Sequence, residues 1–235
     1  MYIILINNLM ISTSTGNNKK RVYLITNHKS GDILEKELKN IDFISEIRIG
    51  SPNIINEMTE SFLSLFDCFI YDLCDGGFLI NHEKTKEIEL YIKNDGGSFL
   101  VTHDHWDNIG LKSPLDLIGL EYYQQFQWEG ANKARICLSH ELFNCYHDLT
   151  NLGKIDIATT HQTLHKIIEK ESNKARTIME LEINKPTNIK HNYLVVNEPG
   201  YGRIAYWAAG HSFTISENEK KLFKNIIAWL TKYKK

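Results

Sequence analysis

The stretch Gly96-Gly97-Ser98-Phe99-Leu100-Val101-Thr102-His103-Asp104-His105 decides the fold of this chain. Its glycine pair predicts the end of a preceding helix, because glycine adopts the backbone conformation that stops a helix without strain. The apolar and β-branched residues 99–102 then predict a short buried strand. In open α/β sheets, ligands bind outside the carboxyl ends of the strands. We therefore expect His103, Asp104 and His105, which follow this strand, to lie in the functional site.

Upstream of this stretch, apolar strand-like runs alternate with helical patterns. The order β-α-β-α-β-α-β predicts a parallel sheet with helices on both faces. We expect 99–102 to be a central strand, flanked by the runs at 68–71 and 22–26. The expected helices are one through Leu34 and Leu38, one over 53–65 with Asn53 as its N-cap, and one carrying Ile88, Tyr91 and Ile92.

The second half of the chain is less regular, and it ends in a strongly marked helix. Ser216-x-x-Glu219 is a capping box, and an apolar stripe follows it at helical spacing. Gly200-Tyr201-Gly202 opens a GxGxxA match, but Pro199 before it predicts a hairpin turn, not a dinucleotide site. The expected strands are 134–138, 155–158, 176–181, 193–196 and 202–207.

Composition limits the class of protein. The chain has 235 residues, 42% of them hydrophobic and 24% charged, with a net charge of −2. This balance gives no reason to expect a nucleic-acid partner, and no run approaches the roughly 20 apolar residues of a membrane span. We expect residues 1–20 to be a flexible extension, since the apolar start lacks the basic segment of a signal peptide, and 21–235 to be a single domain.

The cysteines favour a reducing, cytoplasmic compartment. The four of them form no CxxC pair, and the sequence has no Asn-x-Ser/Thr glycosylation site. Cys68 and Cys137 lie in apolar runs, where we expect them to behave as small core residues.

Histidine motifs leave a metal site open. His103 to Asn108 nearly spells the HxHxDH zinc signature of metallo-β-lactamase-like hydrolases, with Asn108 in the place of the last His. His161 and His165 have the i, i+4 spacing that would place both on one face of a helix. His140-Glu141 begins an HExxH-like string that Asn144 breaks, and no GxSxG elbow is present.

Two segments together resemble the ThuA-like branch of the class I glutamine amidotransferase-like superfamily. They are the 96–103 stretch, which resembles the glycine-rich turn, strand and elbow of that branch, and 202–212, which resembles its segment before the last helix. The resemblance covers most of residues 21–234 and implies a flavodoxin-like three-layer α/β sandwich with a mostly parallel central sheet. ThuA-like proteins are linked to trehalose and related sugar utilisation, so it also implies a carbohydrate-like ligand.

The resemblance also shapes the expected chemistry. True amidotransferases carry a Cys nucleophile at the elbow, where this chain has His103, and no HxE motif follows the late strand. The resemblance therefore implies a protein without amidotransferase activity. Charged Asp104 and His105 follow the elbow, where small residues are common in the branch.

We thus expect a His/Asp pocket that binds or acts on a small sugar or polyol. If the protein is an enzyme, a hydrolase-type reaction on a carbohydrate-like substrate is expected, with histidine as the acid or base because it titrates near neutral pH. No nucleotide cofactor is expected, and a divalent metal stays open. The alternatives are a non-catalytic binding or interaction module on the same scaffold and a metal-dependent hydrolase. The expected catalytic residues are His103, Asp104 and His211, and the expected substrate-binding residues are Asp75, Gly76, Gly77, His105 and His161.

Overall fold

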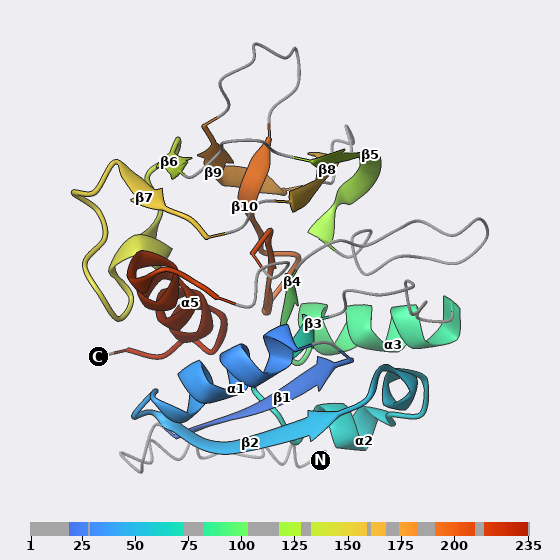
Figure 1. Ribbon diagram of the computed structural model, residues 1–235. Helices are drawn as coiled ribbons and strands as arrows, with labels where there is room; N and C mark the ends of the chain where they lie inside the picture. Colours follow the sequence, from blue (N-terminus) through green and yellow to red (C-terminus); the bar gives the residue numbers. More distant parts are fainter. Residues whose placement is uncertain are drawn as a thin grey trace, which may run out of the picture.

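The computed structural model describes residues 19–27, 29–72, 82–102, 118–127, 133–158, 161–167, 174–182, 191–209 and 214–234, with the backbone alone at 82, 121–127 and 161–166. Figure 1 shows the arrangement of the elements. In chain order they are β1 (Lys20–Thr26), α1 (Ser30–Lys39), β2 (Ile44–Gly50), η1 (Pro52–Asn56), α2 (Glu60–Leu63), β3 (Cys68–Asp72), α3 (His82–Lys93), β4 (Ser98–Thr102), β5 (Leu120–Gln127), β6 (Lys133–Ile136), η2 (Glu141–Asn144), β7 (Lys154–Asp156), β8 (His161–Ile167), β9 (Arg176–Leu181), β10 (Asn192–Asn197), β11 (Arg203–Trp207) and α5 (Glu217–Leu230).

Nine of the described strands form one mixed sheet in the order β2-β1-β3-β4-β11-β10-β9-β6-β7. The first five strands of this order are parallel, and the remaining pairings are antiparallel. Every residue of β3 and β4 is buried, as expected for parallel strands covered on both faces. The predicted α/β fold, with helices on both faces of a largely parallel sheet, is confirmed.

The central position of β4 is confirmed, but one of its predicted neighbours is wrong. β4 pairs in parallel with β3 on one side and with β11 on the other. β1 lies one strand further away, on the far side of β3. After β4 the chain forms the antiparallel half of the sheet. Its last strand, β11, then pairs with β4 on the side opposite β3 (Figure 1).

The two faces of the parallel half are covered by different helices. Tyr23, Phe69 and Phe99 lie in one register row and face α2 and α3, from which Phe62 packs on Tyr23 and Tyr91 packs on Phe69. The opposite face is covered by α1 and α5. These two helices contact each other, in part through an ion pair of 3.7 Å between Glu37 and Lys224.

The predicted helix over 53–65 is wrong, because the chain forms two short helices there. η1 begins at Pro52, whose fixed φ suits the first position of a helix, so Asn53 lies inside it and is not its cap. Thr59 then breaks the run with an extended backbone, and its hydroxyl accepts a hydrogen bond from the backbone N–H of Phe62. A new helix, α2, therefore starts at Glu60.

Other local predictions divide between confirmed and corrected. The capping box of Ser216 and Glu219 is present, and the predicted turn at Gly200 joins the antiparallel strands β10 and β11. β6 ends at Ile136 and β7 at Asp156, so both are shorter than predicted. Cys137, just past the end of β6, is consequently exposed and not part of the core, whereas Cys68 is buried as predicted.

Candidate functional site

Four neighbouring parallel strands end in a single register row at the carboxyl edge of the sheet. Thr26 of β1 pairs with Asp72 of β3, Asp72 with Thr102 of β4, and Thr102 with Trp207 of β11. Residues paired in this way in a parallel sheet share one face. Asp72, Thr102 and Trp207 are each fully buried. A buried row that contains polar side chains therefore lies directly beneath the carboxyl edge. This is the edge at which α/β sheets bind their ligands.

Asp72 is the centre of this row. Its Oδ1 accepts a hydrogen bond of 2.6 Å from the Thr102 hydroxyl, and its Oδ2 accepts one of 3.0 Å from the Thr26 hydroxyl. Ser30, in the first turn of α1, donates its hydroxyl to the same Oδ2 at 2.8 Å. A buried carboxylate is costly unless hydrogen bonds replace its water shell, and these three donors do so.

A second buried carboxylate lies at the same edge, where α5 begins. Glu219 is fully buried, and its Oε1 accepts a hydrogen bond of 2.7 Å from the Tyr193 hydroxyl. Its Oε2 accepts from the backbone N–H groups of Ser216, at 2.7 Å, and Ala158, at 2.9 Å. Burial raises the pKa of Tyr193 well above its ordinary value, and the nearby Glu219 charge raises it further. The tyrosine is therefore a fixed hydroxyl donor.

These contacts fix the chain at the points where the loops of the carboxyl edge start or end. Asp72 and Thr102 are the last residues of β3 and β4. Glu219 ties the turn before α5 to the segment that follows β7. Such a rigid base is what a binding site built on loops requires, because loop side chains are positioned by the elements that hold the loop ends.

The predicted site residues follow this base directly in the sequence. His103 comes immediately after Thr102, and Asp75 comes three residues after Asp72. His161 is the first residue of β8, and its Cα pairs with that of Gln127 in β5. His161 thus lies on a strand. The prediction that His161 and His165 share one face of a helix is therefore wrong. His103, Asp104, His105, Asp75, Gly76, Gly77 and His211 lie outside the residues that the structure describes.

Asp72 and Glu219 belong to this edge but are not among the residues predicted from the sequence. The signal for Asp72 was a single carboxylate directly after the buried strand 68–71, the same signal that selected His103 after 99–102. Glu219 was recognised only as a helix cap. Tyr193 and Ser30 carry no comparable signal, because their contacts to the two carboxylates depend on the way the sheet and the helices pack.

Metal ligation and membrane spanning can be judged only for the described part of the chain. Within the ranges given above, no three His, Cys, Asp or Glu side chains are grouped so that they could hold a metal ion. Among the same residues, no helix has the length and apolar character needed to cross a bilayer.

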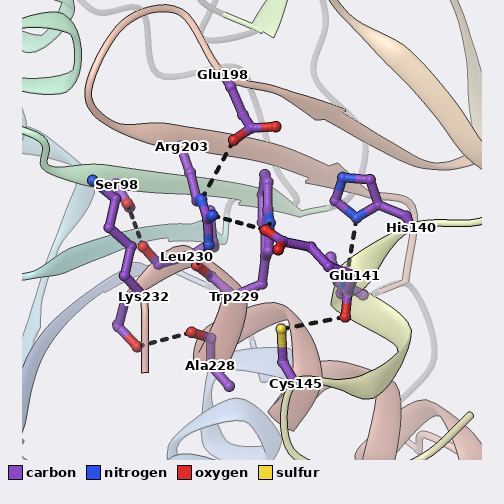
Figure 2. A network of polar contacts seen from close by, with 12 residues as sticks. Ser98, His140, Glu141, Cys145, Glu198, Arg203, Ala228, Trp229, Leu230 and Lys232 are labelled. Atoms are coloured by element: carbon purple, nitrogen blue, oxygen red, sulfur yellow. Dashed lines mark hydrogen bonds and ion pairs between the residues drawn. The ribbon is translucent and has the colours of Figure 1, made fainter. Parts of the chain in front are cut away.

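The opposite, amino edge of the sheet carries a different polar network (Figure 2). Arg203 donates to the Trp229 carbonyl and to Glu141, both at 2.7 Å, and its guanidinium lies 4.9 Å from the centre of the Trp229 ring. Glu141 also accepts a hydrogen bond of 2.9 Å from the Trp229 indole. Arg203 thus binds the carboxyl end of α5 to the start of β11, which is a structural role.

A cavity of about 240 Å³ also opens at this amino edge. Three of the five charged residues that line it, Lys20, Asp67 and Lys232, are engaged with protein partners. Asp67 accepts from the backbone N–H of Arg21 at 2.8 Å and lies 3.4 Å from the Lys20 ammonium. Lys232 donates to the carbonyl of Tyr201. The paired charges and the distance from the carboxyl edge make this cavity a weaker candidate site than the row around Asp72.

No family model matches this sequence, and no curated protein matches it. Solved structures do match, at low identity. A protein from Bacteroides uniformis described as ThuA-like is 12% identical, with a TM-score of 0.67 over 94% of this chain and 95% of the other. A cytoplasmic protein from Salmonella typhimurium LT2 is 14% identical, with a TM-score of 0.61 over 89% of this chain and 99% of the other.

A third match is to part of a larger enzyme. The cold-adapted β-galactosidase of Rahnella sp. R3 is 12% identical, with a TM-score of 0.61 over 91% of this chain but only 31% of the enzyme. At such identities these likenesses establish the fold alone. The fold is thus shared with a protein described as ThuA-like, as the resemblance implied.

Proposed function

We propose that this chain binds a small sugar or polyol at the carboxyl edge of its sheet, through a His/Asp pocket built on the row around Asp72. The observation that carries the proposal is the in-register end of β1, β3 and β4 with the hydroxyls of Thr26 and Thr102 on one buried carboxylate. Such a base gives the loops after Asp72 and Thr102 fixed starting points. In this scaffold those loops are where a ligand is expected to bind.

The ligand class is inferred from two sources. Histidine and aspartate side chains are hydrogen-bond donors and acceptors of the kind that orient hydroxyl groups. The fold is shared with a protein described as ThuA-like and with part of a β-galactosidase, which acts on a sugar. Both sources support a polyhydroxylated ligand, and neither selects a particular one.

The roles proposed for individual residues follow the sequence analysis. His103 and His211 are the acid and base candidates, with Asp104 beside them. Asp75, Gly76, Gly77, His105 and His161 are proposed to contact the ligand. Residues 21–235 are proposed to act as one domain in the cytoplasm, after an extension of 20 residues.

Titration calorimetry with a panel of trehalose, lactose, galactose and glycerol tests the proposal. We expect one class of sugar to bind the intact chain and to lose at least tenfold in affinity to His103→Ala and to His211→Ala, about 1.4 kcal/mol. His140→Ala, at the amino edge, is the control and should leave the affinity unchanged. Binding of none of these compounds, or equal losses in all three variants, would exclude this function. Addition of a chelator in a second series tests the metal-dependent alternative.

A further inference from the structure

Asp72 carries an inference that goes beyond ligand contact. It is fully buried, and its two oxygens receive three hydroxyl donors from three different elements: β1, α1 and β4. One carboxylate therefore connects the end of β1, the start of α1, the end of β3 and the end of β4. We propose that Asp72 is the positioning residue of the site, and that it sets the backbone at Thr102, the residue that precedes His103 in the sequence. This inference rests on the proposed function.

The geometry gives the mechanism of this positioning. Thr102 directly precedes His103, and its hydroxyl lies 2.6 Å from Asp72 Oδ1. A hydrogen bond to a charged acceptor is shorter and stronger than one between neutral groups. It restricts the side chain of Thr102, and through it the backbone that leads into His103. Asparagine would offer one accepting oxygen and an NH2 group where the carboxylate offers two accepting oxygens, so at least one of the three hydroxyls would have to reorient.

The two ends of β4 offer a matched pair of variants. Ser98, its first residue, is fully buried, and its hydroxyl donates to the carbonyl of Leu230 at 2.6 Å. Thr102, its last residue, is also fully buried and donates at the same distance. Ser98→Ala and Thr102→Val each remove one buried hydroxyl from the same strand. Only Thr102→Val does so next to Asp72.

The experiment uses the full-length chain with isotope-labelled histidine side chains. The imidazole signal of His103 is assigned by its loss in His103→Gln, and it is then followed in Thr102→Val, Asp72→Asn and Ser98→Ala at a temperature where all are folded. We expect Thr102→Val and Asp72→Asn to shift or broaden the His103 signal and to weaken trehalose binding about tenfold. We expect Ser98→Ala to lower the melting temperature and to change neither the His103 signal nor the affinity for trehalose.

Three results would overturn the inference: an unchanged His103 signal in Thr102→Val, equal changes in Thr102→Val and Ser98→Ala, or unchanged trehalose affinity in a chain whose His103 signal has moved. If Asp72→Asn does not fold, Thr26→Val takes its place, because it removes a donor to Asp72 at a position far from His103 in the sequence. Failure of the proposed function is separate, because the His103 signal reports positioning even when trehalose does not bind the wild-type chain.

Discussion

The Tyr193 hydroxyl donates a hydrogen bond of 2.7 Å to Oε1 of Glu219, and both residues are fully buried. Tyr193 belongs to β10, in the antiparallel half of the sheet, and Glu219 belongs to the first turn of α5. The contact therefore joins the two ends of the segment that contains β11. Because Ser216 and Ala158 donate backbone N–H groups to the other carboxylate oxygen, the cluster fixes three segments around one charge.

Tyr193→Phe should destabilise the protein without changing its fold. The variant removes one donor to a buried charge, which costs about 2 kcal/mol and lowers the melting temperature by about 4–8 °C in a chain of this size. Tyr201→Phe is the control, because Tyr201 is 75% exposed and its phenol should contribute almost nothing. Thermal unfolding of the two variants compares the same chemical change at a buried and an exposed position. Equal melting temperatures would show that the Glu219 charge does not need this donor.

Arg203→Lys should be clearly destabilising even though it keeps the charge. Arg203 uses separate guanidinium nitrogens for the Trp229 carbonyl and for Glu141, and it stacks on the Trp229 ring (Figure 2). A lysine ammonium cannot reproduce this planar arrangement, so we expect a loss of about 1–3 kcal/mol in the free energy of unfolding.

Arg48→Lys is the control for Arg203→Lys, because Arg48 is exposed, forms one described ion pair, with Glu46, and also lies over an aromatic ring, 5.5 Å from the centre of Phe66. Its change should stay within about 0.5 kcal/mol. Urea unfolding measures both variants. A loss at position 203 no greater than that at position 48 would contradict a structural role for the network.

The sequence predicted the parallel half of the sheet much better than the rest. The runs at 22–26, 68–71 and 99–102 are continuously apolar, a pattern that sheet strands covered on both faces produce. β5 and β8 were missed, because Leu120–Gln127 and His161–Ile167 mix polar and apolar residues without a clear period. The sequence pattern also did not predict that β11 pairs with β4, since the two strands are more than 100 residues apart in the chain.

The carboxyl edge on which the site is proposed was predictable from the sequence, but the contacts that support this edge were not. Polar residues after buried strands locate the carboxyl edge, and Asp72 and Thr102 indeed end neighbouring strands there. The donation by Ser30 to Asp72 requires α1 to pack over this face, which no local pattern contains. Burial of Asp72 likewise depends on long-range packing, so a sequence pattern does not distinguish it from a carboxylate in an exposed loop.

The described cysteines should differ widely in reactivity. Cys137 is exposed, whereas burial raises the pKa of Cys145 to about 11, and Cys68 is fully buried with its thiol pKa raised by burial. In a Cys74→Ser background, a thiol reagent at pH 8 should modify Cys137 first, Cys145 slowly, and Cys68 only after unfolding. Peptide mass spectrometry over time measures the order. Early modification of Cys68 in folded protein would contradict the packing described for β3.

The pH dependence of stability should contain a contribution from His140. Its Nδ1 accepts a hydrogen bond of 3.2 Å from the backbone N–H of Leu142, a role that requires this nitrogen to be unprotonated. Burial lowers the pKa of His140, and the charge of Arg176 lowers it further. In the unfolded chain the ring titrates near pH 6.5, so the unfolded state binds more protons between the two pKa values. Stability is therefore fully present above about pH 6.5 and is lost as the pH falls toward the lower, folded-state pKa.

His140→Asn isolates this contribution. Asparagine is a favoured N-cap, so its side-chain oxygen can accept from Leu142 at every pH in the range. We expect the melting temperature of the wild-type chain to fall more steeply than that of His140→Asn between pH 7.5 and pH 5. His191, whose pKa burial also lowers, is unchanged in both chains and cancels in the comparison. Parallel melting curves across this range would mean that His140 has the same proton affinity in the folded and unfolded states, and that its hydrogen bond to Leu142 does not exclude a proton from Nδ1.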